Sequence, residues 1–209
     1  MFVRSRMSKK CVCVSPTDSL AKAYAAIREK GFEGLPVAKD GKVIGVITTW
    51  DILQPLAEAH QPETYLSKTL VAEVMTKQPI TIREDDIIEE AALLMHKHDI
   101  SLLPVINEHN DVVGILTESD FLRIFVEALG LERKGTRISL MVNDKIGELA
   151  RLTEVVREKG FSIISLVTFE PGRMHADVVL RVAGDDPKPV VDALVEAGFR
   201  VTHVSQVWA

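Results

Sequence analysis

The residues of this chain that are best suited to binding chemistry are two pairs of threonine and aspartate. Each pair forms a Thr-x-x-Asp motif directly after an apolar run, with Thr48 before Asp51 and Thr117 before Asp120. Where a buried strand turns into a helix, free backbone N–H groups and the positive end of the helix dipole attract a phosphate. The threonine hydroxyl can join the phosphate contacts, and the aspartate carboxylate can accept both hydroxyls of a ribose. The two motifs therefore point to a nucleoside monophosphate or a longer adenine nucleotide.

The motif has a second interpretation, because Thr-x-x-Asp also describes an ordinary helix N-cap, and for a single copy that interpretation carries more weight. Residues 36–51 and 104–120, however, are two copies of one pattern, each running from Pro-Val to the motif. The two prolines lie 68 residues apart and the two final aspartates 69, because the turn in the second copy is one residue longer. An internal repeat indicates two similar modules in tandem. Two motifs in register favour a ligand site at matched positions.

Composition argues against several classes of function. The chain has 209 residues, of which 46% are hydrophobic and 26% charged, as in an ordinary globular protein. Its net charge of −5 gives no electrostatic reason to bind nucleic acid or an anionic membrane. We see no apolar run that could span a bilayer and no secretory signal, and we expect a cytoplasmic protein. Cys11 and Cys13 lack a Cys or His pair that would complete a metal site, so we expect no metal and place them in a strand core.

The elements that must position the motifs follow the repeat. In the first copy we expect a strand over residues 11–14, a helix over 21–29, a hairpin of 34–37 and 43–48 across Asp40-Gly41, and a helix over 51–58. In the second copy we expect a strand over 79–82, a helix over 84–97, a hairpin of 102–106 and 112–116, and a helix over 121–129. Each motif then stands at a strand-to-helix junction.

A different unit follows the second copy. Residues 129–135 contain two glycines and a charge cluster, so they are the candidate linker. Beyond them we expect a strand over 136–142, a helix over 146–159 with Leu149 and Leu152 facing inward, and a hairpin of 161–169 and 174–182. A helix over 187–197 and a strand over 199–208 complete the order βαββαβ. This order predicts a ferredoxin-like sandwich of four antiparallel strands under two helices.

Residues 3 to about 128 resemble a tandem pair of CBS domains, also called a Bateman module. The matching pieces are residues 34–37 with 45–51 in the first copy, and 103–105 with 114–120 in the second. Such modules bind adenosine derivatives (AMP, ADP, ATP or S-adenosylmethionine) in clefts between the two repeats. The resemblance implies ribose contacts by the two aspartates, phosphate contacts by the two threonines, and further cleft residues that lie in the first strand of each copy or end the segment before each hairpin: Cys13, Val14, Pro36, Thr81, Ile82 and Pro104.

Two departures from the family pattern stand out. Cys13 occupies the position that matches Thr81, so the first copy lacks a hydroxyl there. No Arg or Lys lies inside either motif, so the charge of a polyphosphate has to be met from elsewhere, with Lys9, Lys10 and Lys77 as candidates. One of the two sites is then weak or empty. The alternative is a module that binds no nucleotide and serves only for dimerisation.

Residues 136 to about 208 resemble an ACT domain. The piece that carries the resemblance is the loop 143–149, which reads Asn-Asp-Lys-Ile-Gly-Glu-Leu and is close to the family's Asp-Arg-Pro-Gly-x-Leu. In ACT domains this loop binds an amino acid, usually at an interface between two copies. The resemblance implies an amino-acid effector site at Asn143, Asp144, Ile146, Gly147 and Leu149. The alternative is a domain used for dimerisation alone.

The full expectation is an α/β (α+β) chain with CBS domains over residues 1–69 and 70–129, a linker over 130–135, and an ACT domain over 136–209. We find no nucleophile elbow, no Walker A loop and no G-x-G-x-x-G, so we expect no enzyme activity. The domain order resembles that of the acetoin-utilisation (AcuB) proteins of bacteria, which implies an allosteric regulator of carbon metabolism. We expect a homodimer without a required cofactor. The rival hypothesis is a structural adaptor that docks a metabolic enzyme and binds no small molecule.

Overall fold

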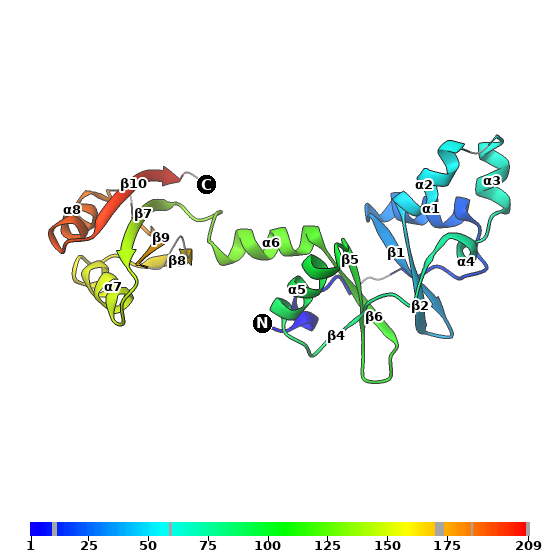
Figure 1. Ribbon diagram of the computed structural model, residues 1–209, viewed down its shortest axis with the longest axis horizontal. Helices are drawn as coiled ribbons and strands as arrows, with labels where there is room; N and C mark the ends of the chain where they lie inside the picture. Colours follow the sequence, from blue (N-terminus) through cyan, green and yellow to red (C-terminus); the bar gives the residue numbers. More distant parts are fainter. Residues whose placement is uncertain (10–11, 59, 170–173, 185, 208–209) are drawn as a thin grey trace. The chain divides into compact units, whose positions relative to one another are not determined.

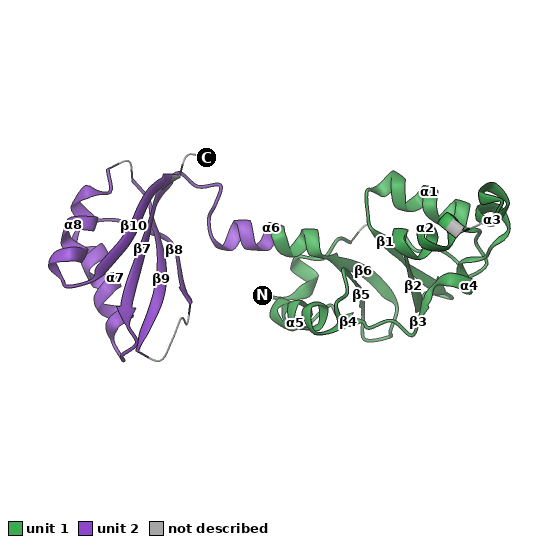
Figure 2. Ribbon diagram, turned by 45° about the horizontal axis from the view of Figure 1, so that its top comes forward, with its two compact units in different colours: residues 1–122 green, residues 123–209 purple. Residues whose placement is uncertain are grey.

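The computed structural model describes residues 1–9, 12–58, 60–169, 174–184 and 186–207. These residues form two compact units, Met1–Leu122 and Arg123–Ala209 (Figure 2). The first unit contains both copies of the repeat, and the second contains the βαββαβ segment. None of the helices in the described part of the chain is long and apolar enough to cross a membrane.

The first copy follows the predicted order (Figure 1). The Ser19 side chain accepts a hydrogen bond from the Lys22 N–H and starts the first helix, which ends at Gly31 in the left-handed conformation. Asp40 and Gly41 both have positive φ, as a two-residue hairpin turn requires. The elements are η1 (Val3–Ser5), α1 (Leu20–Lys30), β1 (Gly34–Lys39), β2 (Lys42–Thr48), α2 (Thr49–Glu58), α3 (Pro62–Lys68), α4 (Val71–Val74) and β3 (Thr76–Lys77).

One prediction for the first copy is wrong. Residues 12 and 13 form no strand, and only Val14 makes a bridge, parallel to Val37. Cys13 is exposed, so the prediction that it lies in a strand core is also wrong, and Cys11 lies outside the described residues. No ladder forms here because this segment runs beside β1 for only one bridged residue. The buried core of this copy is aliphatic instead, and it contains Leu20, Ile27, Leu35, Ile47 and Ile52.

The second copy repeats the plan with a shorter first strand. Only Ile82 and Arg83 are in a strand where we predicted 79–82, and the helix begins at residue 88 where we predicted 84. The Asp86 carboxylate accepts a hydrogen bond from the Arg83 N–H at 2.9 Å, which closes a turn before the helix can start. The elements are β4 (Ile82–Arg83), α5 (Ile88–His98), β5 (Leu102–Ile106), β6 (Val112–Thr117) and α6 (Glu118–Ala128).

The two copies exchange their leading segments. β3, which precedes the second copy, pairs with β2 of the first, and Ser8, which precedes the first copy, bridges to Ile115 in β6. The sheets are accordingly ordered β1-β2-β3 and β4-β5-β6. A single apolar cluster then joins Val46 of the first hairpin to Leu102 and Ile115 of the second. The repeats therefore fold as one unit.

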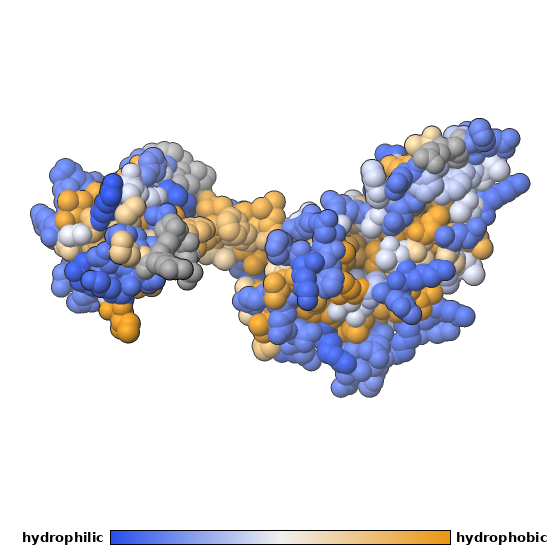
Figure 3. Space-filling model, viewed as in Figure 1, coloured by the Kyte–Doolittle hydropathy of each residue, from blue (hydrophilic) through white to orange (hydrophobic). Residues whose placement is uncertain are grey.

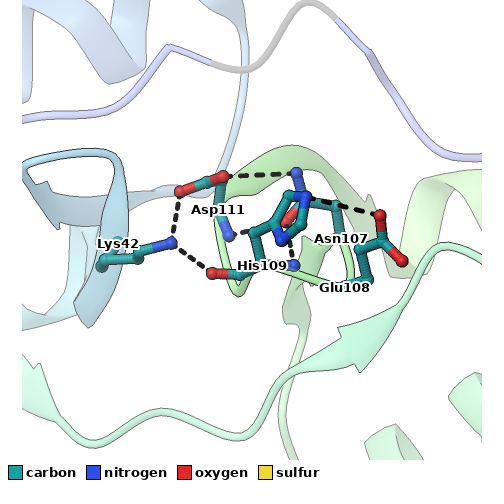
Figure 4. A network of polar contacts seen from close by, with 5 residues as sticks. All are labelled: Lys42, Asn107, Glu108, His109 and Asp111. Atoms are coloured by element: carbon teal, nitrogen blue, oxygen red, sulfur yellow. Dashed lines mark hydrogen bonds and ion pairs between the residues drawn. The ribbon is translucent and has the colours of Figure 1, made fainter.

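The tips of the two hairpins also meet (Figure 4). The Lys42 ammonium donates to the Asp111 carboxylate at 2.6 Å and to the His109 carbonyl, and the Val112 N–H donates to the Gly41 carbonyl at 3.1 Å. The hydrogen bond from Lys42 is the main cause that holds the pKa of Asp111 below its usual value, with Asn107 as the second. This polar contact joins the two hairpins at their tips, at the opposite end of β2 and β6 from the motifs.

The second unit is a ferredoxin-like sandwich, as predicted. Its strands lie in the order β10-β7-β9-β8, every neighbouring pair is antiparallel, and both helices cover one face of the sheet (Figure 1). Between sheet and helices lies a buried aliphatic core. The elements are β7 (Gly135–Asn143), α7 (Glu148–Glu158), β8 (Ile163–Phe169), β9 (His175–Val182), α8 (Lys188–Glu196) and β10 (Arg200–Val207).

Leu149 departs from the prediction for this unit. Leu152 and Val156 are fully buried, but Leu149 is 42% exposed, because α7 begins at Glu148 and Leu149 lies in its first turn beside the preceding loop. The inward orientation that we predicted for it is wrong. Its position at the loop instead suits the second prediction made for Leu149, a place in the effector site.

The segment that we predicted as a linker is held on the sheet of the second unit. The Arg181 guanidinium, on β9, donates to the carbonyls of Gly130 and Arg133, each at 3.2 Å, and Ser165 on β8 donates to the Leu129 carbonyl at 3.0 Å. Arg181 is buried, and this burial, together with nearby Arg137, lowers its pKa. The segment therefore has fixed hydrogen-bond partners within its unit.

Candidate functional site

Both Thr-x-x-Asp motifs form the same closed hydrogen-bond ring. Asp51 Oδ2 accepts from the Thr48 N–H at 2.8 Å and from the Thr48 hydroxyl at 2.7 Å, and the Asp51 N–H donates to Thr48 Oγ1 at 3.2 Å. The ring at Thr117 and Asp120 has corresponding distances of 2.9, 2.9 and 3.4 Å. The helix-cap interpretation of the motif is therefore realised in both copies.

The ring decides which atoms of the first motif can contact a ligand. Within the described residues, Asp51 Oδ1 has no hydrogen-bond donor, so one carboxylate oxygen can accept from a ribose. The Thr48 hydroxyl hydrogen points to Asp51, which leaves the hydroxyl no donor for a phosphate oxygen. Asp120 is only 3% exposed, so its carboxylate is more enclosed than that of Asp51.

Thr48 lies where the two copies face each other. A cavity of about 370 Å³ lies in the second unit, and described residues of the first unit line two further cavities, of about 270 and 450 Å³, which share Thr48 and Ser101. Thr48 comes from the first copy and Ser101 from the second. The smaller cavity is lined by Val46, Thr48, Thr76, Gln78, Pro79, Ile80, Asp99, Ile100, Ser101 and Leu102, and the larger by Phe32, Glu33, Thr48, Thr49, Trp50, Leu53 and Ser101. We call the two together the Thr48 cleft.

The structure places the predicted residues unevenly with respect to this cleft. Thr48 lines it, but Asp51, in the following turn of α2, is absent from the lining of both cavities. Thr81, which is partly buried, is absent from the lining, where its neighbours Pro79 and Ile80 stand instead. The remaining predicted residues of the strands are buried in the unit, namely Val14, Pro36, Ile82 and Pro104.

Sequence reasoning missed Ser101, Asp99 and Glu33. The repeat contains a signal for two of them, because Glu33 and Ser101 are matched positions, 68 residues apart, just before each hairpin. Their carbonyls accept from matched helix N–H groups, from Thr49 at 2.8 Å and from Glu118 at 3.2 Å. The candidate Lys10 lies outside the described residues.

The described residues that line the Thr48 cleft carry net negative charge. Glu33 and Asp99 are its charged side chains, and no Lys or Arg occurs among the described residues that line it. Lys77, a candidate for phosphate contact, is absent from that lining although Thr76 and Gln78 on either side belong to it. Successive residues of a strand point to opposite faces, and this explains the difference.

All five residues predicted for the amino-acid effector site line the ACT cavity of about 370 Å³. Gly147 has φ 91°, a left-handed conformation that a side chain would strain, so a glycine at this point of the loop has a backbone reason. Val142, Ala176 and Val178 supply an apolar wall from the sheet, and Ile146 is fully exposed at the rim. Among the described residues, no group of three His, Cys, Asp or Glu side chains could hold a metal ion.

Comparison with known proteins identifies both units. The CBS domain model matches residues 3–58 and 71–127, and the model of the TTHA0829-like ACT domain matches residues 134–205. Among curated relatives, the L-aspartate semialdehyde sulfurtransferase of Methanocaldococcus jannaschii is 32% identical over 125 residues, which cover 59% of this chain and 23% of that protein. The inosine-5′-monophosphate dehydrogenase of Korarchaeum cryptofilum is 35% identical over 109 residues, which cover 52% and 21%. The match thus spans less than a quarter of either enzyme.

Solved structures agree with this result. The CBS domain pair of protein MJ0100, solved with 5′-methylthioadenosine and S-adenosyl-L-methionine, has a TM-score of 0.54 and 32% identity, covering 60% of this chain and 95% of that one. CBSX2, solved with AMP, has a TM-score of 0.51 and 25% identity, covering 60% and 96%. CBS and ACT domains are regulatory modules. The chain belongs to the CBS-domain family, as a tandem CBS pair followed by a TTHA0829-like ACT domain.

Proposed function

We propose that this protein is a cytoplasmic, non-catalytic sensor that binds an adenosine derivative in the Thr48 cleft. The observation that carries the proposal is that Thr48 of one repeat and Ser101 of the other line the same cavities. Asp51, three residues after Thr48, keeps one carboxylate oxygen without a donor among the described residues, and we assign that oxygen to the ribose. Adenosine ligands in the MJ0100 and CBSX2 pairs support it. The volumes of the two cavities of the Thr48 cleft, about 270 and 450 Å³, lie near the usual range for small-molecule sites.

Trp50 gives the adenine a stacking partner. Its side chain is 70% exposed and lines the larger cavity, and an indole left this open to water can offer one face to a purine ring. The Asp51 oxygen that is free of the cap then accepts a ribose hydroxyl. A ligand held in this way contacts both repeats, so binding changes how firmly they are held together.

A cavity-filling variant tests the proposal. We expect AMP, 5′-methylthioadenosine or S-adenosylmethionine to raise the melting temperature of the wild type, because a ligand at a hundred times its Kd adds about 2.7 kcal/mol to the free energy of unfolding. Ser101→Phe should abolish this stabilisation, since Ser101 belongs to both cavities. Ser67→Phe, on α3 outside the cleft, is the matched control. An unchanged ligand response in Ser101→Phe would refute the Thr48 cleft as the site.

We propose further that the ACT cavity binds an amino acid. The amide of Asn143, the carboxylate of Asp144 and the ammonium of Lys145 can pair with the α-ammonium and α-carboxylate of the amino acid, and the apolar wall favours an aliphatic side chain. Ile146→Ala should weaken such an effector, as measured by calorimetry with valine, leucine and isoleucine. Because Ile146 is fully exposed, its loss should change the free energy of unfolding by less than about 0.5 kcal/mol. Unaltered affinity in the variant would contradict the role of the rim.

A homodimer is part of the proposal. Leu53 on α2 and Leu122 on α6 occupy matched positions of the repeat, and both are exposed. Figure 3 shows hydrophobic residues gathered over α6. Two exposed leucines at matched positions suit a surface that pairs with a second copy. Leu122→Asp should convert the dimer to a monomer, as measured by light scattering. A monomeric wild type would exclude the proposed homodimer.

Control of carbon metabolism, in the manner of acetoin-utilisation proteins, rests on domain order alone. A deletion strain of the native host that grows normally on acetoin would exclude that pathway. The same exposed leucines also suit the rival function, an adaptor that docks a metabolic enzyme. The adaptor hypothesis predicts that a purified partner enzyme binds the wild type but not Leu122→Asp. It also predicts that no adenosine ligand changes the stability of the wild type or its binding to the enzyme.

A further inference from the structure

The charges and hydrogen bonds of the Thr48 cleft discriminate between classes of adenosine ligand. Glu33 lines the larger cavity and Asp99 the smaller, and both side chains are exposed to solvent. No Lys or Arg stands among the described lining residues to balance them. The cleft therefore presents negative charge to whatever group extends from the 5′ position of a bound adenosine.

A phosphate near Thr48 would contact the start of α2, where three backbone N–H groups already have partners. A helix N-terminus binds phosphate through N–H groups that have no other partner. Here the Thr48 N–H donates to Asp51 Oδ2 at 2.8 Å, the Thr49 N–H to the Glu33 carbonyl at 2.8 Å, and the Asp51 N–H to Thr48 Oγ1 at 3.2 Å. The Asp51 carboxylate itself also offsets the positive end of the helix dipole.

We propose that the Thr48 cleft selects adenosine derivatives whose 5′ substituent is neutral or cationic, a thioether or a sulfonium, over phosphorylated nucleotides. The inference rests on the proposed function and names the ligand class of that site. The sulfonium and ammonium groups of S-adenosylmethionine outweigh its carboxylate by one positive charge, so this ligand gains from Glu33 and Asp99. A thioether is neutral and is indifferent to them, and a phosphate is repelled.

Calorimetry with four probes tests the selection: S-adenosylmethionine, 5′-methylthioadenosine, AMP and ATP. Binding is assigned to this cleft by its loss in Ser101→Phe, which separates it from binding at Thr117 and Asp120. We expect both sulfur compounds to bind at least about tenfold more tightly than AMP. The affinity for S-adenosylmethionine should fall as salt rises from about 0.1 M to about 1 M, where the screening length drops from roughly 10 to 3 Å, while that for 5′-methylthioadenosine stays level.

Charge-neutralising variants identify the residues responsible. Glu33→Gln and Asp99→Asn should each weaken S-adenosylmethionine about two- to fivefold, the range for exposed ion pairs, and leave 5′-methylthioadenosine unchanged. Glu108→Gln, in the turn at the other end of the β5–β6 hairpin, is the matched control and should alter neither. AMP or ATP that binds in the cleft as tightly as the sulfur compounds would overturn the inference while the proposed function stands. If none of the four probes binds in the cleft, both this inference and the proposed function of the cleft are excluded.

Discussion

At the scale of single residues, the Thr-x-x-Asp motif serves the fold and the proposed site with different atoms of one carboxylate. Oδ2 of Asp51 closes the cap ring with Thr48, and Oδ1 has no donor within the described residues. The sequence alone offered the cap and the ligand site as competing interpretations. In the structure they are compatible for a ribose, because each needs only one oxygen.

Two variants of Asp51 separate these roles. Asp51→Ala removes the cap and should lower the free energy of unfolding by about 1 kcal/mol without ligand. Asp51→Asn keeps an acceptor for the Thr48 N–H and hydroxyl, so we expect a smaller loss. Both should weaken the adenosine ligand, because an amide oxygen is a poorer acceptor for a ribose than a carboxylate. Chemical denaturation and calorimetry on the same samples measure the two effects, and full affinity in Asp51→Ala would exclude a ribose contact.

Two glycines at matched positions make the exchange of leading segments feasible. A Cβ on Gly45 would lie 2.9 Å from the Thr76 carbonyl oxygen and 2.6 Å from Met75 Sδ, and one on Gly114 would lie 3.0 Å from the Ser8 carbonyl oxygen. A methionine side chain can move away, but a paired strand cannot. The glycines therefore allow the leading segment of each copy to lie against the hairpin of the other.

We expect Gly45→Ala to destabilise the CBS pair by about 1–3 kcal/mol, the usual cost of overpacking. The added methyl group must push β3 away from β2, and both take part in the lining of the Thr48 cleft through Val46 and Thr76. Denaturant unfolding measures the loss, and the affinity for adenosine ligands should fall with it. A variant as stable as the wild type would mean that β3 is free to shift.

At the scale of elements, the pattern of apolar residues predicted helices and strands well and their first residues less well. α1, β1, β2, β5 and all four strands of the ACT sheet lie where expected within a few residues. β4 and the start of α5 do not, because the Asp86 carboxylate closes a turn on the Arg83 N–H. An acidic residue near the start of a helix can lie in the first helical turn or in a turn before it. Which of the two forms depends on the hydrogen bonds that its carboxylate accepts, and these cannot be read from the sequence.

Arg181 gives a prediction at this scale, since one buried side chain holds two carbonyls of the segment between α6 and β7. Arg181→Ala leaves the carbonyls of Gly130 and Arg133 without that donor and should cost about 1–3 kcal/mol. Hydrogen exchange should rise across residues 130–134. Arg137→Ala is the control, since Arg137 pairs with Arg181 across the sheet but bonds to Ser139 of its own strand. Unchanged hydrogen exchange of residues 130–134 in Arg181→Ala would show that the hydrogen bond from Ser165 to the Leu129 carbonyl is enough to hold the segment.

At the scale of the whole molecule, one helix, α6, connects the CBS pair and the ACT domain along the chain. α6 begins directly after Thr117 of the second motif, and its end leads into the segment that Arg181 and Ser165 hold. On this continuity of the chain we base the proposal that ligands of the two units are allosterically coupled, through α6 and the segment that follows it.

Coupling between the sites has to be reciprocal. If an aliphatic amino acid changes the affinity for the adenosine ligand by some factor, the adenosine ligand must change the affinity for the amino acid by the same factor, typically about 5–150-fold. Calorimetric titration of each ligand with and without saturating amounts of the other measures both factors. Arg181→Ala should reduce them together. If the affinity for each ligand is the same with and without the other ligand, allosteric coupling is excluded and the two sites are independent.

The sequence alone was enough to predict the architecture. Repetition at a fixed offset predicts two similar modules in tandem, and the order βαββαβ predicts the sandwich. The resemblance to CBS and ACT domains added the candidate site residues, of which Thr48 and those in the loop 143–149 line cavities. Only the tertiary structure decided which residues of the two repeats meet. Thr48 and Ser101 are 53 positions apart, and β3 and Ser8 pair across copies. Such long-range contacts depend on packing between hairpins, which leaves no periodic trace in either segment.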